Sequence, residues 1–68
     1  MTITLNGEQS EVADRAAVTD LIATLGLKPE RIAVEINGRI IRRSDWESIT
    51  LVEGDKVEIV HFVGGGAR

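Results

Sequence analysis

Residues 18–27 read VTDLIATLGL, and this stretch predicts the single main helix of the chain. Its apolar residues recur at i, i+3, i+4 and i+7, the spacing that gives a helix one buried face. Those residues are Val18, Leu21, Ile22 and Leu25. Gly26 stands where a left-handed C-terminal cap belongs, and Pro29 blocks continuation. At the other end, Asp14 is a candidate N-cap and Asp20 favours the positive end of the helix dipole.

A hairpin is expected before this helix. Thr2–Leu5 alternates polar and apolar residues, and Asn6-Gly7 follows it. Asn-Gly is the strongest two-residue hairpin signal, because both positions of a type I′ turn need positive φ. Glu8–Val12 is then the expected return strand.

A second hairpin is expected after the helix. Ile32–Ile36 predicts a strand, and a second Asn-Gly, at Asn37-Gly38, turns it into Arg39–Ile41. The segment Ser44-Asp45-Trp46 predicts a short helical turn capped by Ser44. Its Trp46 is expected to cover an edge of the small core, with partner contact as the alternative role.

The last strand is expected over Lys56–Val63, after a turn at Glu53-Gly54-Asp55. Two sets of apolar residues alternate along it, one beginning at Val57 and one at Val60. Apolar residues on both faces are typical of a central strand that is covered on at least one side.

This order of elements predicts an α+β fold of the β-grasp, or ubiquitin-like, kind. Four to five strands form a mixed sheet, and the one main helix packs across one of its faces. The expected domain covers residues 1–63. Residues 64–68 form a glycine-rich C-terminal tail that is expected to be flexible.

Size and composition narrow the classes of function. With 68 residues, the chain fits one domain near the lower size limit for a stable core, so a deep catalytic cleft is disfavoured. The formal net charge of −3 and the lack of a basic run disfavour nucleic-acid binding. No signal peptide or membrane-length apolar run is apparent, and there is no cysteine for a disulfide framework. We therefore expect a cytoplasmic protein that does not insert into membranes.

Two longer stretches carry a family resemblance. VEINGRIIRRSDW, residues 34–46, and LVEGDKVEIVHFVGGG, residues 51–66, resemble the ThiS family of sulfur-carrier proteins in thiamine biosynthesis. The resemblance covers essentially the whole chain. The related molybdopterin sulfur carriers are similar but usually longer.

The resemblance implies a carrier that is the substrate of other enzymes and is not itself an enzyme. An adenylyltransferase resembling ubiquitin-activating enzymes would use ATP to adenylate the carboxylate of Gly66. A sulfur donor such as a cysteine desulfurase would convert the adenylate to a thiocarboxylate, and thiazole synthase would accept the sulfur. Gly64, Gly65 and Gly66 would enter the partners' active sites, and the carrier itself would bind no cofactor. The chain departs from the family pattern at Ala67-Arg68, which would have to be removed before use.

Several residues are candidates for partner contact. Arg42 and Arg43 suit steering toward an acidic enzyme surface, and His61 and Phe62 immediately precede the tail. His61 is the only histidine and there is no cysteine, so no metal site and no catalytic constellation are expected. If the chain carries sulfur, the absence of cysteine leaves only the C-terminal carboxyl as the attachment point. The residues leave two alternatives open: a sulfur carrier for molybdopterin or cysteine synthesis, and a ubiquitin-like binding module whose tail has no chemistry.

Overall fold

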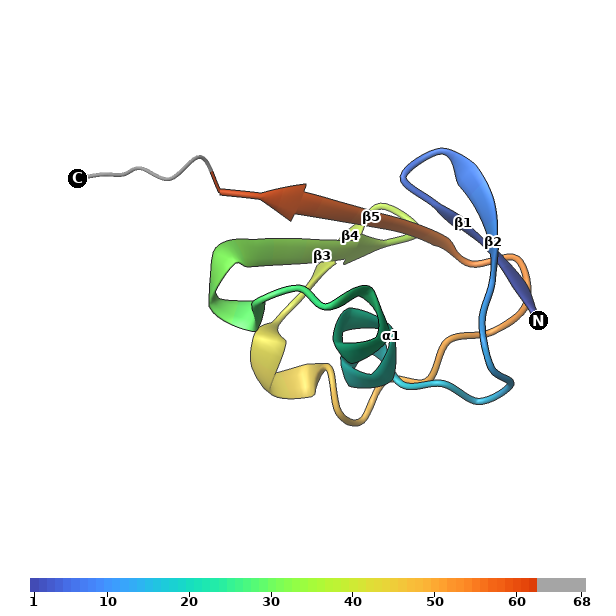
Figure 1. Ribbon diagram of the computed structural model, residues 1–68, viewed down its shortest axis with the longest axis horizontal. Helices are drawn as coiled ribbons and strands as arrows, with labels where there is room; N and C mark the ends of the chain where they lie inside the picture. The colour runs from blue at the N-terminus through green and yellow to red at the C-terminus, as the bar shows by residue number, and fades with distance from the viewer. Residues whose placement is uncertain (63–68) are drawn as a thin grey trace.

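A computed structural model describes residues 1–62 as a five-stranded sheet with one α-helix across one face (Figure 1). In chain order the elements are β1 (Thr2–Leu5), β2 (Glu8–Glu11), α1 (Val18–Leu25), β3 (Ile32–Ile36), β4 (Arg39–Ile41) and β5 (Lys56–His61). Short 3₁₀ turns, Pro29–Arg31 and Arg43–Asp45, precede β3 and follow β4. The predicted β-grasp fold is therefore confirmed. The boundary predicted between residues 63 and 64 lies outside the described residues and stays a prediction.

The strands lie in the order β2-β1-β5-β3-β4, so the last strand of the chain is the central one. β5 runs parallel to β1, with Thr4 beside Lys56, and antiparallel to β3, with Ile32 beside His61. The remaining pairs, β1 with β2 and β3 with β4, are antiparallel hairpins. The prediction of a central last strand in a mixed sheet is thus confirmed, and β5 joins two otherwise separate hairpins.

Both hairpins turn at their Asn-Gly pairs, as predicted. Asn6 and Asn37 have φ of 48° and 52°, and the glycines that follow have φ of 85° and 86°. These values lie in the left-handed region that a type I′ turn requires at both central positions. The return strand of the first hairpin ends at Glu11, one residue earlier than expected.

The side chains of the two turn asparagines also fasten the hairpins to the central strand. The Oδ1 atom of Asn6 accepts the Ile59 N–H at 2.7 Å, and that of Asn37 accepts the Lys56 N–H at 2.9 Å. Each asparagine therefore satisfies a backbone donor of β5 in addition to forming its turn. Neither contact is visible in the local sequence, because each joins residues that are distant along the chain.

Helix α1 ends as predicted but begins differently. Gly26 has φ of 71°, and its N–H donates to the Ala23 carbonyl, which completes a left-handed cap. At the start, Ala17 occupies the cap position, and the Asp20 carboxylate accepts the Ala17 N–H at 2.9 Å. The prediction of Asp14 as the N-cap is wrong because Asp14 lies three residues too early and its carboxylate has another partner.

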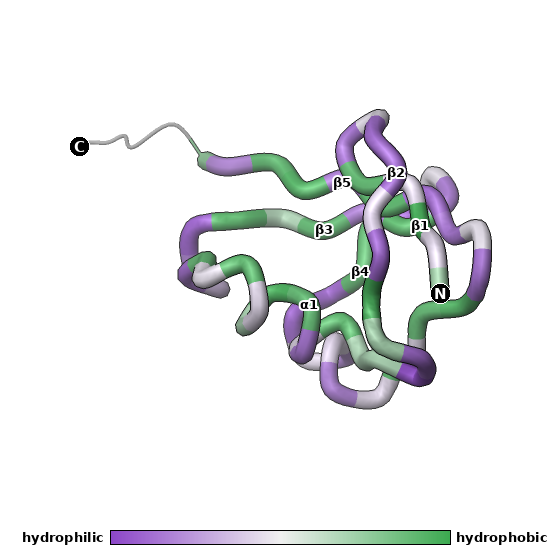
Figure 2. The backbone as a smooth tube through the Cα atoms, turned by 45° about the vertical axis from the view of Figure 1, so that its right-hand side comes forward, coloured by the Kyte–Doolittle hydropathy of each residue, from purple (hydrophilic) through white to green (hydrophobic). Residues whose placement is uncertain are grey.

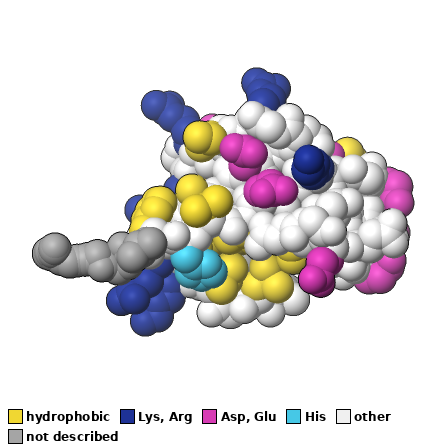
Figure 3. Space-filling model, turned by 90° about the horizontal axis from the view of Figure 1, so that it is seen from above, with side chains coloured by type: hydrophobic (Ala, Val, Ile, Leu, Met, Phe, Trp, Pro, Cys, Tyr) yellow, Lys and Arg dark blue, Asp and Glu magenta, His cyan; other side chains and the backbone are white. Residues whose placement is uncertain are grey.

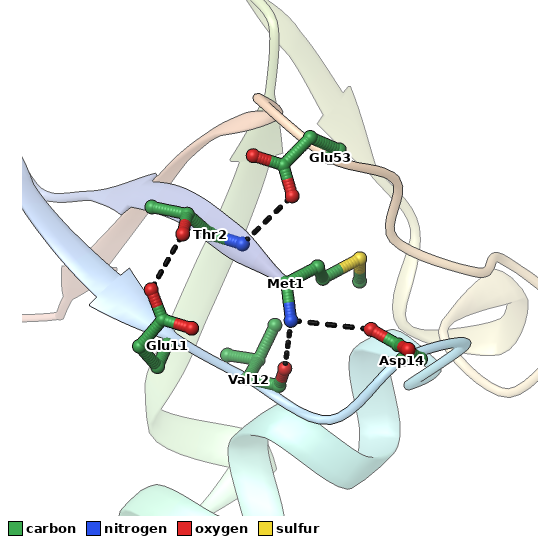
Figure 4. A network of polar contacts seen from close by, with 6 residues as sticks. All are labelled: Met1, Thr2, Glu11, Val12, Asp14 and Glu53. Carbon is green, nitrogen blue, oxygen red and sulfur yellow. Dashed lines mark hydrogen bonds and ion pairs between the residues drawn. The ribbon is translucent and has the colours of Figure 1, made fainter.

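That partner is the N-terminal ammonium group (Figure 4). The Met1 ammonium lies 3.2 Å from the Asp14 carboxylate and donates to the Val12 carbonyl at 2.8 Å. Beside it, the Thr2 N–H donates to the Glu53 carboxylate at 2.9 Å. These contacts connect the start of β1 to the segment before the helix and to the turn that leads into β5.

The core lies between α1 and the inner face of the sheet. Figure 2 shows the apolar stretches of β3 and β5 side by side, while hydrophilic residues gather in the turns. Of the four predicted helix-face residues, Val18, Leu21 and Ile22 are buried and Leu25 is exposed at the helix end. The other fully buried large side chains come from the sheet and the long connection: Ile3, Val34, Trp46, Leu51 and Val57.

Trp46 belongs to the centre of this core and does not cover its edge. Its side chain is only 2% exposed, and its Nε1–H donates to the Ile41 carbonyl at 3.1 Å. The expected cap by Ser44 is also wrong: the turn begins one residue earlier and has Arg42 in the cap position without a side-chain hydrogen bond. The turn still serves to direct Trp46 inward, so a partner-contact role for this residue is excluded by its burial.

Asp55 is the one buried charged residue among those described. Its carboxylate accepts the Asn37 side-chain amide at 3.0 Å and the Val52 N–H at 2.9 Å. The expectation of a turn at Glu53–Asp55 is confirmed, with Gly54 at φ of 85°. Asp55 is a structural carboxylate that holds this turn against the second hairpin.

Candidate functional site

The predicted tail begins where the central strand leaves the sheet. The last pairing of β5 places His61 beside Ile32, and the Phe62 N–H donates to the Arg31 carbonyl at 2.9 Å. Figure 1 shows this end of β5 on the opposite side of the molecule from the N-terminus. Gly64, Gly65 and Gly66 lie outside the described residues, so their roles stay predictions. The structure does describe the surface from which they extend.

An apolar patch covers the outer face of the sheet beside this end of β5. The strand register places Ala33 beside Val60 and Glu35 beside Ile40, on the face opposite α1. The side chains of Ile40, Val60 and Phe62 are 75%, 57% and 59% exposed. We call these three residues the outer-face patch. Figure 3 shows hydrophobic side chains, in yellow, gathered near the one histidine of the chain, in cyan.

Arginines border this patch at the tail end. β4 runs in the same direction as β5, because both are antiparallel to β3, so Arg42 and Arg43 follow β4 at the end where β5 also finishes. Arg31 lies there too, through its carbonyl contact with Phe62. Within residues 1–62 the one ion pair is between Met1 and Asp14, so no arginine is paired there. A cluster of exposed, unneutralised cations next to an apolar patch is suited to an acidic protein surface.

His61 is exposed and lies at the base of the predicted tail, where Figure 3 shows it in cyan. In the part of the chain that the structure describes, no group of three or more His, Asp or Glu residues is placed to hold a metal ion. His61 and Phe62 thus lie together with the arginines at one end of the molecule. Partner contact by these four predicted residues stays a prediction.

Sequence reasoning missed three members of this surface: Arg31, Ile40 and Val60. The sequence did contain a signal for the outward position of Ile40. The Asn37-Gly38 turn fixes the hairpin register, and alternate residues of the hairpin then point to opposite faces of the sheet. For Arg31 no local signal exists, since its position depends on the pairing of β3 with β5.

A hollow of about 260 Å³ lies elsewhere, between the β2–α1 connection and the helix. Most of its lining is apolar, and two of its lining residues, Glu11 and Asp20, have carboxylates. Both already have hydrogen-bond partners within the fold, Thr2 and Ala17 respectively. The hollow therefore brings together no free catalytic pair.

The β-grasp fold places this chain in the class of ubiquitin-like proteins. Its central last strand is followed in the sequence by a glycine-rich segment. A solved ubiquitin-like protein from the archaeon Caldiarchaeum subterraneum matches 96% of this chain and all of its own, with a TM-score of 0.53 and 26% identity. The sequence matches the ThiS family over residues 3–66. The chain belongs to the ThiS family.

Individual relatives agree with this assignment. The sulfur carrier protein ThiS of Bacillus subtilis is 38% identical over 63 residues, which cover 91% of this chain and 96% of the relative. The crystal structure of a thiamine biosynthesis protein (ThiS) from Geobacter metallireducens has a TM-score of 0.85 and 38% identity, and the match covers 97% of this chain and all of that one. These matches confirm the resemblance to the ThiS family.

A relative of a different kind is the thiazole synthase of Magnetococcus marinus, which is 39% identical over 66 residues. The match covers 97% of this chain but 20% of the relative, so the chain spans about a fifth of that protein's length.

In residues 1–62, no helix combines the length and apolar character needed to cross a membrane.

Proposed function

We propose that this protein carries sulfur for the thiazole of thiamine, with the carboxyl group of Gly66 as the attachment point. The observation that carries the proposal is the ThiS family match, which extends through Gly66 and ends there. The match therefore includes the predicted working residue and leaves out Ala67 and Arg68. The named Bacillus and Geobacter relatives support the same assignment.

The proposed chemistry is acyl activation followed by exchange of oxygen for sulfur. One oxygen of the Gly66 carboxylate attacks the α-phosphorus of ATP, pyrophosphate leaves, and an acyl-adenylate forms. The terminal sulfur of a persulfide, on a donor such as a cysteine desulfurase, then attacks the carbonyl carbon, and AMP leaves. A thiol reductant cleaves the resulting acyl disulfide, so that the donor sulfur is left in a disulfide with that thiol. The product is a C-terminal thiocarboxylate. ATP belongs to the adenylylating partner in this scheme, and the carrier binds no cofactor.

The residues suit this chemistry. Glycine has no Cβ to obstruct attack on its carbonyl, and it fits narrow channels that other residues cannot enter. The chain has no cysteine, so a protein-bound persulfide on the carrier is impossible. Gly66 is four positions beyond Phe62, so the reacting carbonyl lies at most about 14 Å beyond the described end of the chain. A partner can therefore contact the outer-face patch and the carboxyl group at the same time.

Thiazole synthase is the acceptor that we propose. Two relatives that carry a segment similar to this chain, from Magnetococcus marinus and Paramagnetospirillum magneticum, are named thiazole synthase. Segments that are joined in one chain in some organisms commonly act on each other when they are separate. The two relatives, which contain a segment similar to this chain within a protein named thiazole synthase, thus support thiazole synthase over other acceptors of sulfur.

The test of the proposed function is the intact mass of the protein isolated from its own cell. We expect a fraction of the molecules to end at Gly66 and to be heavier than the plain carboxylate form by one sulfur-for-oxygen exchange. Alkylation of the thiocarboxylate before analysis should increase the mass of only this heavier species. If cells grown without thiamine contain only the unmodified carboxylate form, the proposed carrier role is wrong.

Charge reversal at the tail end should slow association with the adenylylating partner. Arg42→Glu and Arg43→Glu are expected to lower the association rate by about 10-fold each at low ionic strength, because exposed charges steer encounter. The free energy of unfolding should change by less than about 0.5 kcal/mol, since both side chains are exposed and unpaired in residues 1–62. Stopped-flow binding at two salt concentrations measures the effect, and Lys28→Glu is a charge-matched control outside this pair. Unchanged rates in both variants would place the docking surface elsewhere.

A further inference from the structure

The outward edge of β4 has backbone groups that the sheet does not use. Ile36 and Arg39 flank the two-residue Asn-Gly turn, so they form the hydrogen-bonded pair that closes the hairpin. Hydrogen-bonded and non-bonded pairs alternate along an antiparallel ladder, so Val34 and Ile41 form the next bonded pair. Ile40 lies between them and directs its N–H and C=O away from β3.

This edge is also apolar at its centre. The Ile40 side chain has the largest exposed fraction, 75%, among the exposed large hydrophobic residues in the described part of the chain. Exposed edge strands are commonly guarded by charges, which prevents unwanted pairing with other chains. The arginines around β4 could serve that purpose alone, but a guarded edge has no need for a β-branched apolar residue at its middle position. The combination of an open backbone and an exposed Ile40 is that of an edge built to accept a strand.

The charges at this edge indicate what kind of strand it accepts. Arg39 begins β4, and Arg42 and Arg43 follow it; all three are exposed and none forms an ion pair within residues 1–62. The opposite edge of the same sheet, β2, has the reverse character. Its sequence is EQSE, with Glu8 and Glu11 at its ends and no large apolar residue. The molecule therefore presents one basic, apolar edge and one acidic, polar edge.

We propose that the β4 edge binds an extended, acidic segment of a partner protein as a sixth strand. The Ile40 N–H and C=O make main-chain hydrogen bonds to the segment, an aliphatic residue of the segment packs on the Ile40 side chain, and its flanking carboxylates pair with Arg39, Arg42 and Arg43. This interaction uses the side of the domain and does not involve Gly66. Peptide binding at this edge can therefore be tested separately from the chemistry at Gly66.

A titration of the isotopically labelled 68-residue chain with a synthetic peptide tests this proposal. The peptide has a Val-Ile-Val centre between pairs of Asp and Glu, with both ends blocked. Nuclear magnetic resonance should show the largest shifts at the amides of Ile40 and Arg42, and the exchange of the Ile40 amide hydrogen with solvent should slow in the complex. A matched peptide with Lys in place of each acidic residue should not bind, and added salt should weaken binding of the acidic one.

Two pairs of variants separate backbone pairing from simple surface contact. Ile40→Pro removes the outward N–H and should weaken peptide binding about 10-fold relative to Ile40→Thr, which keeps it. Arg39→Glu with Arg42→Glu should weaken binding by at least about 10-fold, whereas Glu8→Lys on β2 should not weaken it. Because Ile40→Pro could disturb the hairpin, the hydrogen-exchange measurement on the unaltered chain provides an independent test of the same bond.

The proposal fails if the shifts lie on β2 or on β5 while the Ile40 amide stays unchanged and unprotected. It also fails if the acidic peptide does not bind at millimolar concentration, or binds no better than the lysine peptide. Sulfur transfer to Gly66 that proceeds normally in an Arg39→Glu variant, which leaves Arg42 and Arg43 in place, would leave the proposed function intact while locating this second interaction outside it.

Discussion

A chain that ends at Gly66 is expected to be converted completely to the thiocarboxylate, and the 68-residue chain is expected to remain unchanged. In the longer chain the terminal carboxylate belongs to Arg68, whose side chain is long and cationic. Two additional residues displace the carbonyl group by up to about 7 Å. A misplacement of about 1 Å at a reacting centre can cost 100-fold in rate, so we expect at least that loss.

The measurement is intact mass after incubation with an adenylylating partner, ATP and a sulfur source. A chain ending at Gly65 is the matched control, since it keeps the glycine terminus but shortens the reach by one residue. Equal conversion of the 66-residue and 68-residue chains would show that Gly66 is not the working terminus. If neither chain reacts with several adenylylating partners, a ubiquitin-like module without tail chemistry becomes the better explanation.

Trp46→Ala is expected to remove most of the stability of the domain. The side chain is 2% exposed at the centre of a small core, and truncation of a buried tryptophan costs about 3–5 kcal/mol. A domain of this size has a total unfolding free energy of only about 3–9 kcal/mol. We therefore expect a large fraction of unfolded protein at 37 °C.

Urea unfolding followed by far-ultraviolet circular dichroism measures this loss, because the variant lacks the tryptophan fluorescence. Trp46→Phe is the matched control: it keeps an aromatic ring in the core but removes the Nε1–H that donates to Ile41, and should cost about 1–3 kcal/mol. An unfolding midpoint for Trp46→Ala within error of the unaltered chain would show that Trp46 does not lie in the core.

The elements with local signals were predicted well from the sequence. Asn6-Gly7 and Asn37-Gly38 determine their turns through backbone geometry that few other residues adopt, and the hairpin registers follow from them. The end of α1 follows in the same way from Gly26. These features depend on residues that are neighbours in the sequence, so local propensity and periodicity were sufficient.

The features that sequence reasoning missed depend on contacts between distant segments. Asp14 is a good N-cap residue, but the fold brings it to the Met1 ammonium. Asp55 was expected only as a turn residue, but Asn37 and Val52 satisfy its carboxylate in a buried position. Trp46 becomes central only because a 3₁₀ turn directs it beneath β4.

The same difference between local signals and distant contacts applies to the candidate site. Its chemistry was predicted from the glycines and the family resemblance, and Gly64, Gly65 and Gly66 remain predictions because they lie outside the described residues. Its docking surface could be predicted only in part. Arg42 and Arg43 were recognised by their charge, and His61 and Phe62 precede the tail in the sequence. Arg31 joins them only through the pairing of distant strands.

The central position of β5 has a consequence for the order of events during synthesis. The hairpins β1–β2 and β3–β4 have no strand pairing with each other, and Lys56–His61 is the strand that joins them. A nascent chain can form both hairpins early, since each is local, but its sheet cannot close until the ribosome has translated the last strand. The glycines follow β5 within a few codons. The strand that completes the docking surface and the glycines of the tail are therefore translated almost together.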